Sequence, residues 1–195
     1  MDLSPLEVGV RDAYGRIVIP KDLVPPDCPW PVVLGFDPGT RIAGYGAVVI
    51  APDAPRLVCC GVIQPKEKDV FARLGSIAAE FEELLVALRP SVVAIESVFA
   101  ARNVRSALRI GEARGAVLAV AARRGVESVE YAPAVAKKAL VGNGAASKEQ
   151  VAAMVANVLG RPPLDVPLDA TDALSLALTH VFRLREARLL DTTRR

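Results

Sequence analysis

The chain has 195 residues, of which 52% are hydrophobic and 24% charged, and its formal net charge is +2. This length suits one domain with an appendage, and the composition is that of a chain with a core, which excludes disorder of the whole. No uncharged apolar run reaches about 18 residues, so we expect no membrane span. The first residues carry acids and prolines instead of a basic start before an apolar run, so we expect no secretory signal.

The chain begins with a segment whose composition differs from the rest. Residues 1–31 hold six of the fifteen prolines, and we expect them to form a flexible extension. From residue 32 onwards, apolar runs and helical spacings replace this pattern. The expected strands are 32–37, 44–51, 57–63, 92–96 and 126–131, and the expected helices are 69–88, 103–124, 133–140, 147–159 and 168–188.

This order of elements indicates an α/β fold. Three meandering strands followed by alternating helices and strands predict a mixed five-stranded sheet with helices on both faces, the layout of an RNase H-like domain. We assign that domain to residues 32–187 and expect a short basic tail over 188–195.

Cysteine and histidine are scarce, which excludes several kinds of site. The three cysteines (Cys28, Cys59 and Cys60) are too few for a disulfide framework, and we interpret them as core residues in a reducing compartment. Cys59 and Cys60 are adjacent, so they should face opposite sides of a strand. His180 is the single histidine, which excludes most zinc sites.

Four acids stand where buried acids are unusual. Asp37 and Glu96 each end an apolar strand, and Asp169 and Asp172 are three residues apart at the start of an apolar helix. Clustered carboxylates repel one another unless a hard cation neutralises them, and Mg²⁺ prefers oxygen ligands. Two such ions can drive phosphodiester hydrolysis. The alternative is that these acids are ordinary helix-start and turn residues.

The near-zero net charge conceals segments of opposite sign. Residues 101–124 hold six arginines against one acid, Glu112, whereas residues 149–180 hold four acids and one arginine. This pattern is typical of a polyanion partner combined with a cation site, although a solvated helix face would have the same charges.

Four sequence blocks resemble those of RuvC-type Holliday junction resolvases. They are Gly35-Phe36-Asp37-Pro38-Gly39-Thr40-Arg41, Ala94-Ile95-Glu96-Ser97-Val98-Phe99, Val141-Gly142-Asn143-Gly144 with Lys148, and Asp169-Ala170-Thr171-Asp172-Ala173-Leu174. All four occur in order between Val32 and about Arg185. The resemblance implies a homodimeric, Mg²⁺-dependent endonuclease of the cytoplasm and nucleoid, with two ions in each active site and Mn²⁺ as a substitute. It would make paired nicks across four-way junction DNA together with RuvA and RuvB.

The resemblance also assigns roles to individual residues. The metal-binding acids fall on Asp37, Glu96, Asp169 and Asp172, and two lysines that assist phosphate binding and catalysis fall on Lys137 and Lys148. Phe99 falls on the aromatic residue that stacks on a base, although a core aromatic would fit the pattern as well. The expected DNA contacts are Phe99, Arg102, Asn103, Arg105, Arg109 and Lys138.

Other functions compete with this one. A YqgF-like nuclease shares the strand–Asp–x–Gly opening, and a non-catalytic junction-binding relative would share the fold. Actin-like ATPases also have an Asp-x-Gly-Thr loop but need a much longer chain. The Asp-x-x-Asp pair and the arginine-bearing helix favour the RuvC type.

Overall fold

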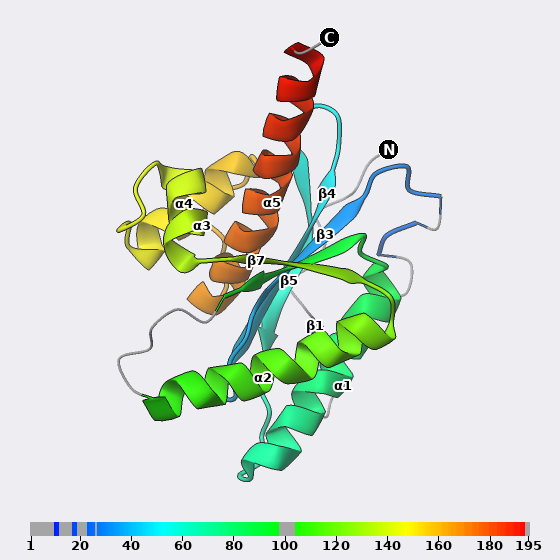
Figure 1. The fold of residues 1–195 in the computed structure, drawn as a ribbon, viewed down its shortest axis with the longest axis vertical. Coiled ribbons are helices and arrows are strands. Elements are labelled where there is room, and N and C mark those ends of the chain that lie inside the picture. Colours follow the sequence, from blue (N-terminus) through cyan, green and yellow to red (C-terminus); the bar gives the residue numbers. More distant parts are fainter. Residues whose placement is uncertain (1–9, 12–16, 19–22, 26, 98–103, 194–195) are drawn as a thin grey trace.

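The computed structural model describes residues 10–11, 17–18, 23–25, 27–97 and 104–193. Its main sheet has five strands, β3 (Val32–Asp37), β4 (Ala43–Ile50), β5 (Pro55–Ile63), β6 (Val92–Glu96) and β7 (Glu127–Tyr131), in the order β5-β4-β3-β6-β7. β3, β4 and β5 are antiparallel neighbours, and β6 and β7 run parallel to β3. The predicted mixed sheet is confirmed, with β3 at its centre (Figure 1).

Helices cover both faces of this sheet. α1 (Val70–Leu88) and α2 (Val104–Arg123) pack together on one face, and α3 (Pro133–Val141), α4 (Lys148–Val158) and α5 (Leu168–Thr193) cover the other (Figure 1). β1 (Val10–Arg11) and β2 (Ile17–Val18) form a separate antiparallel pair. None of the helices in the described ranges is long and apolar enough to cross a membrane.

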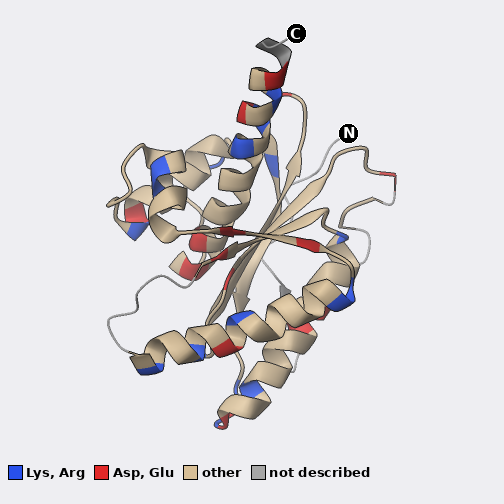
Figure 2. Ribbon diagram, in the orientation of Figure 1, with Lys and Arg blue, Asp and Glu red and all other residues tan. Residues whose placement is uncertain are grey.

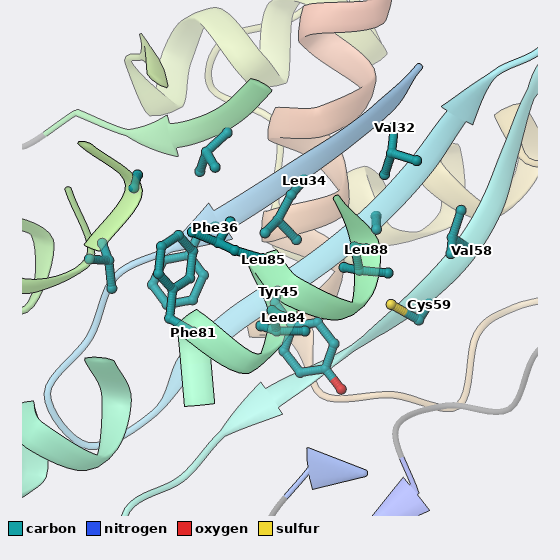
Figure 3. Close-up of a cluster of buried hydrophobic side chains, with 14 of the residues drawn as sticks. Val32, Leu34, Phe36, Tyr45, Val58, Cys59, Phe81, Leu84, Leu85 and Leu88 are labelled. Atoms are coloured by element: carbon teal, nitrogen blue, oxygen red, sulfur yellow. The ribbon is translucent and has the colours of Figure 1, made fainter. Parts of the chain in front are cut away.

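Each face of the sheet has its own apolar core. Phe36 and Phe81 meet edge to face at 4.8 Å between ring centroids in the core beneath α1 (Figure 3). Cys59 belongs to this core and Cys60 to the core beneath α3, α4 and α5, so the two thiols face opposite sides of β5 as predicted. Such two-sided burial explains why the central strands are continuous apolar runs.

Local signals set the helix starts. Asp69 caps α1 by accepting a hydrogen bond from the Ala72 N–H at 2.9 Å, and Ser147 and Gln150 form a capping box at the start of α4. α4 therefore begins at Lys148, directly after Ser147, the residue expected to begin this helix. α5 continues to Thr193, so most of the expected tail over 188–195 is helical.

The end of the N-terminal extension packs on the domain, which differs from the expected flexibility. Leu23 and Val24 are buried in the core beneath α1, and Trp30 packs against the same core. The Arg89 guanidinium donates a hydrogen bond to the Val24 carbonyl at 2.7 Å, and Arg56 lies over the Trp30 ring. Burial of two aliphatic side chains outweighs the proline-rich composition here.

Candidate active site

The four predicted acids lie at one end of the sheet. β3 and β6 are parallel neighbours with Phe36 opposite Ile95, so Asp37 and Glu96 leave the sheet side by side at its carboxyl edge. Asp169 and Asp172 lie in the first turns of α5, which packs across β3 and β4. Figure 2 shows acidic residues at the base of α5 beside the strand ends. The topology thus brings together residues that are more than 130 positions apart in the sequence.

A cleft of about 180 Å³ lies between these elements. Three of the acids line it, Asp37, Glu96 and Asp172, together with both predicted lysines. Asp169 does not line the cleft, but its charge still acts on Asp37. The remaining lining residues are Pro133, Ala136, Val151, Ser175 and Leu176.

The carboxylates of the cleft oppose one another's ionisation. Burial, and then the charges of Glu96 and Asp172, raise the pKa of Asp37 to about 7. Burial and the charge of Asp172 also raise the pKa of Glu96. A site that makes its own acids hard to ionise is one where an added cation is favoured.

Lys148 supplies positive charge to this cleft. Its ammonium forms a hydrogen-bonded ion pair with the Asp172 carboxylate. Burial alone would lower the pKa of Lys148, but the hydrogen bond and charge of Asp172 outweigh it, and the pKa is raised. Because the capping box begins α4 at Lys148, the helix start presents this side chain to the acids.

Lys137 lines the same cleft and also holds a neighbouring loop. Its ammonium donates to the Ala146 carbonyl at 2.7 Å, which fastens the segment between α3 and α4. The loop includes Gly142, the left-handed residue that ends α3. Lys137 therefore combines a structural contact with a position at the cleft.

Whether the cleft suits a divalent cation depends on its carboxylate oxygens. Across the described residues, no three Asp, Glu, His or Cys side chains are grouped closely enough to hold a metal ion as they stand. The donors are nevertheless carboxylate oxygens sharing one cleft, where burial and then the charges of Glu96 and Asp172 raise the pKa of Asp37. This chemistry fits a hard cation such as Mg²⁺ once Lys148 releases Asp172 and the side chains adjust.

The expected DNA contacts fall into two groups. Phe99, Arg102 and Asn103 lie outside the described residues. Arg105 is exposed in the first turn of α2, and Lys138 is exposed on α3 but does not line the cleft.

Much of the predicted basic charge on α2 has an acidic neighbour. Arg109 pairs with Glu112 at 2.8 Å, and Arg114 pairs with Glu130 on β7. Arg123 and Arg124 both bind Glu82 on α1. The pair with Glu112 lies within α2, whereas the pairs with Glu130 and Glu82 reach other elements, whose acids the charge count of residues 101–124 leaves out.

Two hydrogen-bonded features near the cleft were not predicted from the sequence. Ser175 lines the cleft and donates to the Asp172 carbonyl at 2.6 Å; its place one turn after Asp172 was the available signal. The Tyr131 hydroxyl and His180 Nδ1 are hydrogen-bonded at 2.8 Å, which joins β7 to α5. No sequence spacing links these two residues, because they are 49 positions apart.

Comparisons with known proteins give the family. Residues 33–180 match the family profile of crossover junction endodeoxyribonuclease RuvC. The chain is 46% identical over 165 residues to the RuvC of Chromohalobacter salexigens, covering 84% of this chain and 87% of the relative. It is also 46% identical over 157 residues to the RuvC of Nitratidesulfovibrio vulgaris, covering 80% and 94%.

Solved structures agree with the sequence relatives. A structure of Thermus thermophilus RuvC superposes with a TM-score of 0.73 at 38% identity, covering 80% of this chain and 96% of the other. The same enzyme in complex with a Holliday junction substrate gives 0.72 at 36% identity, over the same shares of the two chains. The yeast mitochondrial resolvase Ydc2, at 16% identity and a TM-score of 0.59, shares the fold alone. The predicted RNase H-like fold is confirmed, and the chain belongs to the RuvC family of crossover junction endodeoxyribonucleases.

Proposed function

We propose that this protein resolves Holliday junctions in DNA recombination and repair by metal-dependent, paired phosphodiester hydrolysis across the four-way junction. The observation that carries the proposal is the cleft where Asp37, Glu96 and Asp172 meet Lys137 and Lys148 in a chain of the RuvC family. Carboxylates beside lysines suit a reaction that needs both a hard cation and a bound phosphate.

The acids of the cleft would hold the metal. We assign Asp37, Glu96, Asp169 and Asp172 as ligands of two Mg²⁺ ions, with Mn²⁺ as a substitute. When bound, such ions activate a water and stabilise the leaving oxygen. Asp37 must lose its proton to serve as a ligand. Without a cation its pKa is raised to about 7 by burial and by neighbouring carboxylates, and a bound cation would favour the ionised form. Lys148 neutralises Asp172 while the cation is absent.

The two lysines would bind the scissile phosphate. Lys148 is a point charge at the mouth of the cleft with half of its side chain exposed, so a phosphate can reach its ammonium. Lys137 also lines the cleft, and its ammonium donates to the Ala146 carbonyl in the loop that leads to α4 and Lys148. Removing either lysine should weaken cleavage more than junction binding.

Paired nicking requires two active sites, so we propose a homodimer. DNA contacts would come from Phe99, Arg102, Asn103, Arg105, Arg109 and Lys138, with RuvA and RuvB as partners in the cytoplasm and nucleoid. For Arg109, phosphate binding would compete with its pair to Glu112. Because phosphate contacts release counterions, junction affinity should fall steeply as salt is raised in a gel-shift titration.

The decisive experiment is cleavage of a synthetic four-way junction in Mg²⁺, beside a linear duplex of the same sequence. We expect symmetric nicks in the junction and none in the duplex. Equal cleavage of the two substrates would contradict junction resolution, and so would the absence of cleavage by a folded protein that binds the junction. Replacing Mg²⁺ with a chelator should stop nicking and leave the folded chain intact.

A further inference from the structure

The start of α5 lies directly on the sheet at Gly44. This glycine is buried in β4, where its pairing partner on β3 is Asp37. On its other side it pairs with Val62 of β5. Gly44 is therefore the sheet residue next to one acid of the cleft and beneath the helix that carries two others.

Only a hydrogen atom fits between Gly44 and α5. A Cβ atom added at Gly44 would lie 1.9 Å from the Asp169 carbonyl oxygen and 2.5 Å from its carbonyl carbon. Gly44 is not among the described glycines with a positive φ, so the close approach, and not the backbone conformation, requires glycine here. The obstructing atoms are backbone atoms, which cannot rotate aside as a side chain would.

Neither Gly44 nor the first turn of α5 can move without its neighbours. Gly44 is paired to strands on both sides, which holds its position in the sheet. The Ala170 N–H donates to the Pro167 carbonyl at 3.0 Å, and the Thr171 hydroxyl donates to the Leu168 carbonyl at 2.8 Å. Because these bonds tie the first turn of α5 together, a push at Asp169 would lift the turn as a unit and carry Asp169 and Asp172 with it.

We propose that Gly44 is a positioning residue of the active site, whose missing side chain sets the distance between the strand acids Asp37 and Glu96 and the helix acids Asp169 and Asp172. The proposal rests on the function proposed above, in which these acids share a divalent cation. Coordination by oxygen ligands demands defined distances, so a lifted helix start would weaken cation binding more than it weakens junction binding.

The test compares Gly44→Ala with Gly61→Ala. Gly61 lies on β5, where an added Cβ would meet the Tyr45 hydroxyl and ring instead of α5, so its variant reports the general cost of crowding in the sheet. Binding of Mn²⁺ is measured by titration calorimetry on the intact DNA-free protein, at a temperature where circular dichroism shows every variant folded. We expect Gly44→Ala to bind Mn²⁺ roughly tenfold more weakly than Gly61→Ala, with junction affinity unchanged in a gel shift.

A milder variant keeps the proposal testable if Gly44→Ala does not fold. At Gly46 an added Cβ would lie 2.5 Å from Leu174 Cγ and 3.0 Å from the Leu174 backbone nitrogen, so it approaches the α5 backbone less closely than at Gly44. Gly46→Ala should therefore weaken Mn²⁺ binding less than Gly44→Ala but more than Gly61→Ala. Mn²⁺ affinities equal to that of Gly61→Ala in the folded Gly44 and Gly46 variants would overturn the positioning role. A wild-type protein that binds no Mn²⁺ would instead overturn the proposed metal site, so the two failures are distinguishable.

Discussion

The two ends of β3 are built for opposite purposes. At its start, the Val32 carbonyl accepts hydrogen bonds from both the backbone N–H and the hydroxyl of Ser91, at 2.9 and 3.0 Å. Leu23 and Val24 of the preceding segment are buried nearby in the core. At its other end, Asp37 faces Glu96 and Asp172 in a cleft where burial and like charges oppose ionisation.

The Val32 end of β3 contributes to stability, whereas the Asp37 end lowers it. β3 is only six residues long, yet it joins an end where the Val32 carbonyl is hydrogen-bonded to an end where carboxylates repel one another. Buried acids that repel one another lower stability at neutral pH when no cation is bound, which is the pattern expected of a functional site. The predictions below test this contrast, beginning with the largest expected effect.

Removal of the Asp37 carboxylate should affect chemistry far more than binding. We expect Asp37→Asn to reduce nicking of a four-way junction by roughly 10³-fold or more, because several kcal/mol of transition-state stabilisation depend on the metal site. Junction affinity in a gel shift should stay close to that of the wild type. Loss of junction binding along with cleavage would mean that Asp37 is structural.

The same substitution should change the pH dependence of stability. In the metal-free protein the pKa of Asp37 is raised from 3.8 to about 7, so the unfolded chain releases this proton at a lower pH than the folded chain. Wild-type stability therefore falls as pH rises between about 4 and 7, by about 3 kcal/mol from this residue.

Asp37→Asn removes this loss, and its effect should depend on pH. Measured by urea unfolding in a chelator, the variant should match the wild type at about pH 4 and exceed it by about 3 kcal/mol at about pH 8. Equal stabilities at both pH values would show that neither burial nor the neighbouring carboxylates oppose the ionisation of Asp37. Addition of Mg²⁺ at the higher pH should stabilise the wild type and not the variant.

Shortening a buried side chain of residues 23–31 should lower the stability of the protein. Leu23→Ala removes a side chain that is 6% exposed, and we expect a loss of about 2–3 kcal/mol in the free energy of unfolding. Leu190→Ala, at a leucine that is 55% exposed on α5, is the matched control and should change stability by less than about 0.5 kcal/mol. If the two variants are equally stable, the extension does not contribute to the core.

The smallest effect concerns the bond that joins β7 to α5. Tyr131→Phe removes the hydroxyl that meets His180 and should cost about 1 kcal/mol in urea unfolding. Nicking of the junction should persist, because neither residue lines the cleft. A large fall in cleavage with little loss of stability would place this pair in the active-site machinery instead.

The elements could be predicted from the sequence where one local signal dominates. The apolar run from Val32 to Phe36 has the signature of a strand buried on both faces, and the structure places it at the centre of the sheet. Segments governed by competing signals were less predictable. Leu23 and Val24 stand close to prolines, and their burial depends on a core built from segments that are distant in sequence.

The residues of the candidate site could be predicted from the sequence, but most of their contacts could not. Asp37 and Glu96 could be recognised because an acid that ends an apolar strand is unusual, and Asp169 and Asp172 because of their spacing at a helix start. The ion pair of Lys148 with Asp172, the hydrogen bond from Lys137 to the Ala146 carbonyl, and the acid partners of the α2 arginines could not be foreseen. Each depends on which distant elements pack together.

By itself, the sequence determined the kinds of element, the family and the identity of the acids, because periodicity, chain order and side-chain chemistry are local properties. Only the tertiary structure decided that three of the four acids share one cleft with two lysines, and that Asp37 ionises near neutral pH. It also decided that α5 approaches the sheet closely enough to exclude a methyl group at Gly44. The physical reason is that electrostatic energies and steric contacts depend on distances between residues that the chain order does not specify.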